Sequence, residues 1–180
     1  MTAVFGRRWG RPDPDHRPPA PVVAAWTAHD GPADRVLVAA RSGSTWLLAG
    51  VHRFAAVEPD GSVRWARPWH EIDSAAWGRE SGTLTVTFVD GGRPVVMPLD
   101  REDTFLRTLR ERVQASVVTS ADLPLEGARK ARAVIRQDLA TGTLIEQLVL
   151  GRGTRASEAI DAAAAVAFAA LREETGLPPR

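Results

Sequence analysis

The sequence predicts an α+β fold built mostly from antiparallel strands. Extended segments come in a run, a helical segment follows, and this order repeats once, so the strand–helix–strand alternation of a parallel sheet is missing. Residues 83–89 alternate strictly, with Leu84, Val86 and Phe88 on one face and threonines on the other. Such alternation is typical of an antiparallel strand with one buried and one wet face.

Length and composition limit the class of protein. The chain has 180 residues, which suits one domain or one compact body with an appended lobe. It contains no cysteine, which excludes disulfides and thiolate chemistry and suits a reducing compartment. The longest apolar run, residues 162–171, is too short to span a membrane, and no secretory signal is visible. We therefore expect a cytoplasmic protein without a transmembrane segment.

The charge balance argues against a dedicated nucleic-acid binder. The net charge is +1, from 23 basic and 22 acidic residues, whereas such binders usually carry a large basic excess. The group that would contact nucleic acid comprises Arg129, Lys130, Arg132 and Arg136. We interpret these residues as loop and strand, which scatters them instead of aligning them on one helix face.

The first part of the chain divides into a tail and a β domain. Residues 1–21 are rich in proline and arginine, and we expect a flexible tail there because proline removes backbone donors. The domain is expected to cover residues 22–116, with strands beginning at Val22. Turn signals such as Asp60-Gly61 and Asp90-Gly91-Gly92 separate the expected strands at residues 36–40, 45–49, 53–57, 63–69, 72–77, 83–89 and 95–97.

Two helices and a hairpin complete the prediction. A helix over about residues 101–115 is expected to begin after Asp100 as its N-cap, with an apolar stripe that includes Phe105 and Leu109. Residues 117–180 are expected to form further strands and a helix packed on the first part. A hairpin pairs residues 131–139 with 144–150, and the last helix runs from a Ser157 cap to Gly176.

The stretch from Pro68-Trp69-His70-Glu71-Ile72 to Val113 resembles bacterial pleckstrin-homology-like (PH-like) domains. It shares a Trp-x-x-Ile strand, a hairpin ending in Asp90-Gly91 and a helix with a Phe105-Leu106-x-x-Leu109 core. The resemblance covers roughly residues 34–116, and the whole chain looks like a set of actinobacterial proteins. It implies a PH-like β-barrel or sandwich closed by the following helix, with the C-terminal hairpin and helix as an addition.

PH-like domains serve as scaffolds for lipid headgroups, peptides or proteins, so the resemblance implies a binding role and no cofactor. The convergent basic loops that capture a phosphorylated headgroup are missing here, which argues against lipid binding. We therefore expect a non-catalytic protein-interaction or scaffold protein. Its partner would be a protein or a second copy of itself, bound through an exposed strand edge or a tryptophan-bearing face.

Tryptophans are concentrated in the β domain and allow two interpretations. They fill the core of a small β body, or they form an aromatic groove for an extended peptide. We favour core packing for most of them. Trp65 and Trp69 are four residues apart, so on an unbroken strand they share a face. We predict them, with the neighbouring His70, as an exposed binding group.

The sequence offers no complete catalytic or metal-binding motif. The histidines lack chelating spacing, and on a strand His70 and Glu71 would point to opposite faces, so we predict neither a catalytic nor a metal site. Gly-x-Ser-x-Gly and the Walker pattern are absent. The alternative is an enzyme with a site between the two parts, near His70, Glu71 and Asp73.

Overall fold

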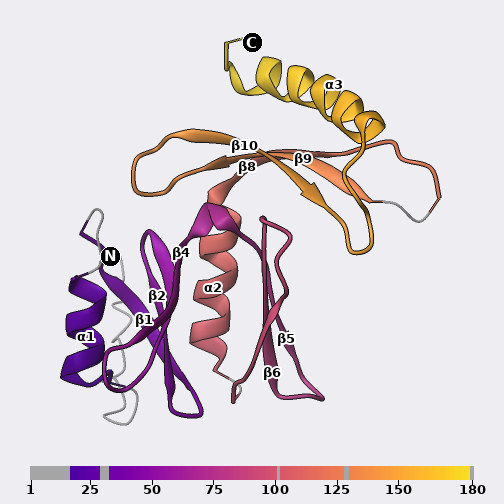
Figure 1. Cartoon of the computed structure of the whole chain (residues 1–180). Helices are drawn as coiled ribbons and strands as arrows, with labels where there is room; N and C mark the ends of the chain where they lie inside the picture. The colour runs from indigo at the N-terminus through magenta and orange to yellow at the C-terminus, as the bar shows by residue number, and fades with distance from the viewer. Residues whose placement is uncertain (1–16, 29–32, 101, 128–129, 179–180) are drawn as a thin grey trace, which may run out of the picture.

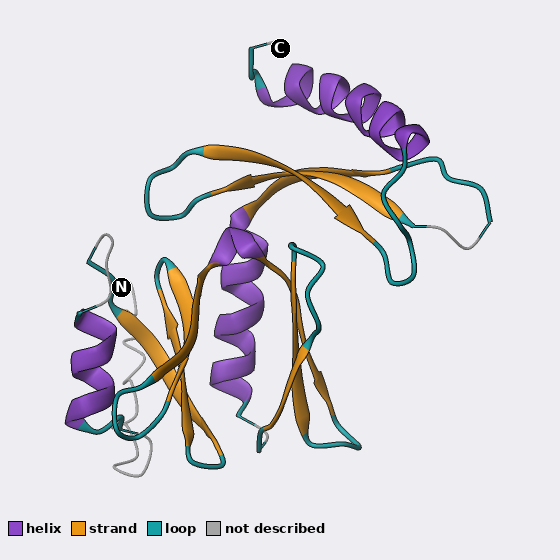
Figure 2. Ribbon diagram, viewed as in Figure 1, coloured by secondary structure: helices purple, strands orange, loops and turns teal. Residues whose placement is uncertain are grey.

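The computed structural model describes residues 17–28, 33–100, 102–127 and 130–178. Over these residues the fold is α+β, with three antiparallel sheets and three α-helices (Figures 1 and 2). The predicted α+β class and the mostly antiparallel pairing are therefore confirmed. The described strands form three open sheets and no closed barrel. Among these residues, no helix is both long and apolar enough to cross a membrane.

The first sheet is a four-stranded meander with both faces covered. Its order is β1-β2-β3-β4, with β1 (Val36–Ser42), β2 (Thr45–Gly50), β3 (Arg53–Val57) and β4 (Val63–Pro68). Every residue of β2 and β3 is buried, because one face of the sheet meets the main core and the other is covered by helix α1 (Ala20–Thr27).

Helix α1 corrects the prediction of a tail to residue 21 followed by strands. Proline is tolerated in the first turn of a helix, where its missing N–H costs nothing, so Pro21, the second residue of α1, does not prevent this helix. Val22 and Trp26 lie four residues apart and are both buried against the outer face of the first sheet. Residues 1–16 of the predicted tail lie outside the described residues.

The second sheet and helix α2 (Asp103–Ser116) complete the N-terminal lobe, by which we mean the described residues up to 116. The sheet has the order β5-β6-β7, and α2 stands between it and the first sheet (Figure 1). The strands are β5 (Ile72–Gly78), β6 (Thr83–Phe88) and β7 (Val95–Pro98), and the short 3-10 helix η2 (Trp69–Glu71) joins β4 to β5.

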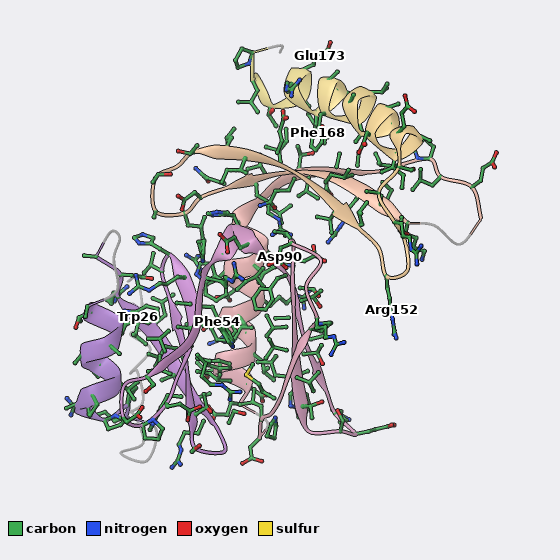
Figure 3. The ribbon with its side chains drawn as sticks, viewed as in Figure 1. Trp26, Phe54, Asp90, Arg152, Phe168 and Glu173 are labelled. Carbon is green, nitrogen blue, oxygen red and sulfur yellow. The ribbon has the colours of Figure 1, made fainter. Side chains whose placement is uncertain are left out.

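Aromatic rings hold the centre of this lobe together. Phe54 stacks on Trp69 with their ring centroids 5.6 Å apart, and Phe105 of α2 lies 6.1 Å from Phe54. Figure 3 shows Phe54 in the interior between the sheets. All three side chains are fully buried, so their burial is the main favourable contribution of this core.

The predicted start of α2 is wrong by a few residues. The helix begins at Asp103 with Glu102 in the N-cap position, so Asp100 is not its cap. The backbone N–H of Leu99 donates to the carbonyl of Gly82, which keeps the chain extended beyond the end of β7. The predicted apolar stripe is present, since Phe105 and Leu109 are both buried.

The C-terminal lobe, residues 117–178, is a three-stranded sheet with one helix. Its order is β10-β9-β8, with β8 (Val117–Asp122), β9 (Ala131–Gln137) and β10 (Leu144–Leu150), and α3 (Glu158–Thr175) covers one face. The predicted hairpin is present, with its first strand ending at Gln137 and not at residue 139, and both predicted ends of the last helix are confirmed. The Ile160 N–H donates to Ser157 Oγ at 3.4 Å, and Gly176 ends the helix with a left-handed φ of 71°.

A tight contact under the β2–β3 turn gives a first prediction. The side chain of Asp34 is fully buried and accepts hydrogen bonds from the N–H groups of Val51, His52 and Arg53. A Cβ added to Gly50 would lie 2.6 Å from Asp34 Oδ2 and 2.4 Å from Trp26 Cζ2.

We expect Gly50→Ala to destabilise the protein by about 1–3 kcal/mol, the usual cost of overpacking a filled interior. Chemical denaturation measures the change. Gly92→Ala is the matched control, because its Cβ would meet only the flexible carboxylate of Asp90 at an exposed turn. Equal losses in both variants would contradict this account.

Candidate functional site at the lobe junction and the β10 edge

Polar side chains connect the C-terminal sheet to the N-terminal lobe. We call this set the junction; its residues are His70, Asp73, Ser116, Arg132, Arg136, Asp138 and Gln147. They come from η2, β5 and α2 on one side and from β9, β10 and the turn between them on the other. Two of the three residues named for the alternative enzyme site, His70 and Asp73, therefore lie where the two parts meet, whereas Glu71 pairs with Arg67.

The centre of the junction is a carboxylate between two guanidinium groups. Arg132 and Arg136 both donate to Asp73 Oδ1, the second at 3.3 Å, and Arg136 also donates to Ser116 Oγ at 3.1 Å. The Arg136 side chain is only 1% exposed. Burial lowers its pKa, the charge of Asp73 opposes that shift and the charge of Arg132 adds to it. Arginine nevertheless remains a cation in proteins, so the buried charge must be paired.

A β-bulge aims Asp73 at these cations. The register of β5 against β6 shifts between Ile72 and Ser74, which leaves Asp73 as the extra residue. A bulge turns its side chain away from the regular alternation of the strand. Sequence periodicity does not reveal this turn, because it assumes an unbroken strand.

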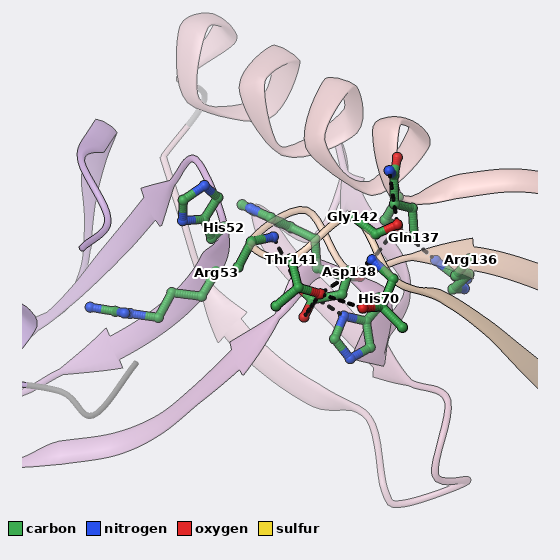
Figure 4. A network of polar contacts seen from close by, with 12 residues as sticks. His52, Arg53, His70, Arg136, Gln137, Asp138, Thr141 and Gly142 are labelled. Carbon is green, nitrogen blue, oxygen red and sulfur yellow. Dashed lines mark hydrogen bonds and ion pairs between the residues drawn. The ribbon is translucent and has the colours of Figure 1, made fainter. Parts of the chain in front are cut away.

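Asp138 forms the second part of the junction (Figure 4). Its carboxylate accepts hydrogen bonds from the Ala140 N–H and the Thr141 hydroxyl, and it lies 3.8 Å from His70 Nδ1. Burial acts to raise the pKa of Asp138. The two hydrogen bonds and the nearby imidazoles of His70 and His52 outweigh burial, so the pKa is lowered.

The side chains of His70, Glu71 and Asp73 do not converge on one point. His70 faces Asp138, Glu71 pairs with Arg67 at 2.9 Å, and Asp73 pairs with Arg132 and Arg136. Residues 69–71 form η2 between β4 and β5, and the bulge in β5 turns Asp73 separately. Within the described residues, no group of three or more His, Asp or Glu side chains is arranged to hold a metal ion.

The expected exposed pair of Trp65 and Trp69 is wrong. β4 ends at Pro68, and Trp69 begins η2 with no exposed surface, donating its indole N–H to the Gly50 carbonyl. Trp65 is half-buried and packs edge-on against Phe54 at 4.9 Å. Trp69 therefore has no accessible surface for a partner, and the core interpretation holds for it.

The basic group considered for nucleic acid is divided by the fold. Arg132 and Arg136 point into the junction and bind Asp73. Lys130 is exposed just before β9, and Arg129 lies outside the described residues. The three described side chains, Lys130, Arg132 and Arg136, therefore do not form a common basic face.

The edges of the three sheets differ in how they are protected. The edge strands are β1, β4, β5, β7, β8 and β10. Bulges interrupt the register of β1, β4, β5 and β8 with their neighbours, and β7 has only four residues, ending in Pro98. Bulges, prolines and short length are among the devices by which proteins prevent a further strand from pairing. β10 has none of these three.

The β10 strand is a regular seven-residue edge of mostly apolar composition. It reads Leu-Ile-Glu-Gln-Leu-Val-Leu and pairs with β9 without a register shift. Its one charge, Glu146, is held by Arg172 of α3 through contacts of 2.5 and 2.6 Å. Gln147 Nε2 donates to the His70 carbonyl at 2.9 Å on the other face. The strand is therefore anchored on both faces.

The backbone of β10 presents hydrogen-bonding groups at its outer edge. The Thr143 carbonyl accepts from the Asp138 N–H, and the Gly151 N–H donates to the Lys130 carbonyl, both toward β9. Backbone groups alternate in direction along an antiparallel strand. The backbone N–H and carbonyl groups of Leu144, Leu148 and Leu150 therefore point away from β9. Within the described part of the chain, no other strand pairs with this edge.

Sequence reasoning missed the main parts of this site. Asp138 had a local signal, because an aspartate shortly before Thr141-Gly142 often bonds to its own turn. Gln147 and the free edge of β10 had no such signal, since strand order is not written in the pattern of apolar residues.

A scan against protein-family models and searches of curated proteins and of solved structures found no match to the chain. What the protein does is therefore inferred from its own residues.

The junction gives a prediction about stability. We expect Asp73→Ala to cost about 3–5 kcal/mol, because it leaves two cations facing each other, one of them buried. Arg136→Met should cost less, since Asp73 keeps Arg132 as its partner. Arg67→Ala, which removes partly exposed pairs with Glu71 and Asp90, is the control and should cost about 1 kcal/mol or less. Denaturant unfolding ranks the stability losses of the three variants. A loss in Arg67→Ala as large as that in Asp73→Ala would contradict this ranking.

A further prediction concerns stability in acid. Because the pKa of Asp138 is lowered in the folded state, its contribution is fully present above about pH 4 and is lost as the pH falls through the lowered value. We expect Asp138→Asn to be less stable than the natural protein at neutral pH and to approach it in acid. Thermal unfolding of both proteins between about pH 2 and 7 measures this, and parallel curves would refute it.

Proposed function

We propose that the protein is a non-catalytic protein-interaction module whose binding surface is the free edge of β10. The observation that carries the proposal is the contrast among the edge strands. β1, β4, β5, β7 and β8 are bulged or short, whereas β10 keeps an uninterrupted register, is mostly apolar and is supported on both faces. A partner strand added to such an edge gains backbone hydrogen bonds for affinity and side-chain contacts for specificity.

The N-terminal lobe fits the scaffold part of this proposal. A four-stranded meander, a three-stranded meander and a following helix support the proposed likeness, which implies a β body closed by a helix. The C-terminal lobe is then an addition that the junction fixes to this scaffold, so that β10 is presented on a rigid body. The lack of cysteine supports a cytoplasmic location as part of the same proposal.

Selection of displayed random peptides on the full chain tests the proposal. We expect the selected peptides to bind as extended strands and to shift the amide resonances of residues 144–150. Leu148→Pro should weaken binding at least tenfold, because proline removes the N–H that points to the open edge while leaving the β9 pairing in place.

Leu148→Ala is the matched control, since it loses the same side chain but keeps the N–H. It should retain binding within a few-fold. Peptides whose contacts map to another surface, or equal losses in the two variants, would overturn the proposal.

A further inference from the structure

We infer that the strand that pairs with β10 is β10 of a second copy of this chain, in an antiparallel two-fold arrangement. This inference rests on the proposed function and names its partner. The two three-stranded sheets would join into one continuous sheet across the two-fold axis. An antiparallel pair of identical strands is the arrangement by which one surface serves both copies of a dimer.

The side chains of β10 are self-complementary in one register. With Gln147 opposite itself, Leu144 lies opposite Leu150 of the second copy, and Ile145 lies opposite Val149. Apolar pairs of this kind stabilise neighbouring strands, and the Ile–Val pair joins two β-branched side chains. In this register, apolar side chains of one copy therefore lie opposite apolar side chains of the other at both ends of the strand.

The same register avoids a charge conflict. Glu146 faces Leu148 of the second copy and not another glutamate. Its carboxylate is already bound by Arg172 of its own α3. The dimer would consequently bury no unpaired charge at this contact.

The direction of the backbone groups agrees with this register. Leu144, Leu148 and Leu150 direct their N–H and carbonyl groups away from β9. Leu144 and Leu150 of the second copy then form a hydrogen-bonded pair, whereas Gln147 and its mate form the closer, non-hydrogen-bonded kind of pair. A shift by one residue would place the outward groups of one strand opposite the inward groups of the other.

The face of β10 on the α3 side carries apolar side chains that are still partly exposed. Helix α3 lies over β9 and β8, and Leu144, Leu148 and Leu150 on its side of the sheet remain half-buried. Phe168 of α3, also half-buried, points toward this sheet (Figure 3). A second copy brings the matching leucines of its own β10 to this strip and so extends the apolar cluster under the helices.

A single engineered cysteine tests the register. The chain has no cysteine of its own, so Gln147→Cys gives one thiol per copy. In the inferred dimer the two Cα atoms of residue 147 lie about 4.5 Å apart, which a disulfide can bridge. We expect most of the protein to form a covalent dimer under mild oxidation. Val96→Cys is the control, because Val96 is 60% exposed on the edge strand β7 and should cross-link at least tenfold less.

Sedimentation analysis of the cysteine-free chain provides the second readout. We expect a concentration-dependent dimer that Leu148→Pro converts to monomer, whereas Leu148→Ala stays dimeric. Amide exchange at Leu144 and Leu148 should slow as the concentration rises. Equal cross-linking of the two cysteine variants, or a dimer that persists in Leu148→Pro, would overturn the inference.

The two proposals can fail separately. A strict monomer that still binds selected peptides along residues 144–150 would remove the second copy as partner and leave the strand-binding function in place. A strict monomer whose selected peptides bind elsewhere would remove both.

Discussion

The buried pairing of Arg136 with Asp73 is the contact on which the rest of the arrangement depends. It ties β9 of the C-terminal lobe to β5 of the N-terminal lobe, and Ser116 at the end of α2 joins it through Oγ. A guanidinium that is 1% exposed cannot be left unpaired without a large cost. The two lobes are therefore held in one orientation by charge and geometry, and apolar burial alone would not specify that orientation.

This orientation has a consequence for the sheet edges. One face of the C-terminal sheet contacts the N-terminal lobe, and α3 covers the other face. The outer strand β10 is therefore left open mainly along its edge. β10 is held on both of its faces. Gln147 bonds to the His70 carbonyl on one face, and Glu146 binds Arg172 of α3 on the other. A strand anchored in this way is preorganised for pairing, because little further ordering is needed when a partner strand binds.

Much of the fold was predictable because its signals are local. The alternation of Leu84, Val86 and Phe88 marks a strand with one buried face, and Ser157 with Gly176 marks the ends of α3. The errors arose where tertiary packing overrode a local sequence rule. Pro21 suggested a tail, yet the burial of Val22 and Trp26 against the first sheet stabilises a helix there. Trp65 and Trp69 suggested one exposed face, but the turn at η2 sends Trp69 into the core.

By itself the sequence determined the α+β class, the antiparallel hairpins, the lack of thiol chemistry and both ends of α3, since each depends on residues close together in the chain. Only the tertiary structure decided which strands became edges, where the bulge turns Asp73, and that Asp138 lies beside His70 while Gln147 bonds to its carbonyl. These features join residues about 60–80 positions apart, or depend on the order of strands in a sheet. The apolar pattern of a strand records which face is buried, but it carries no record of the neighbouring strand.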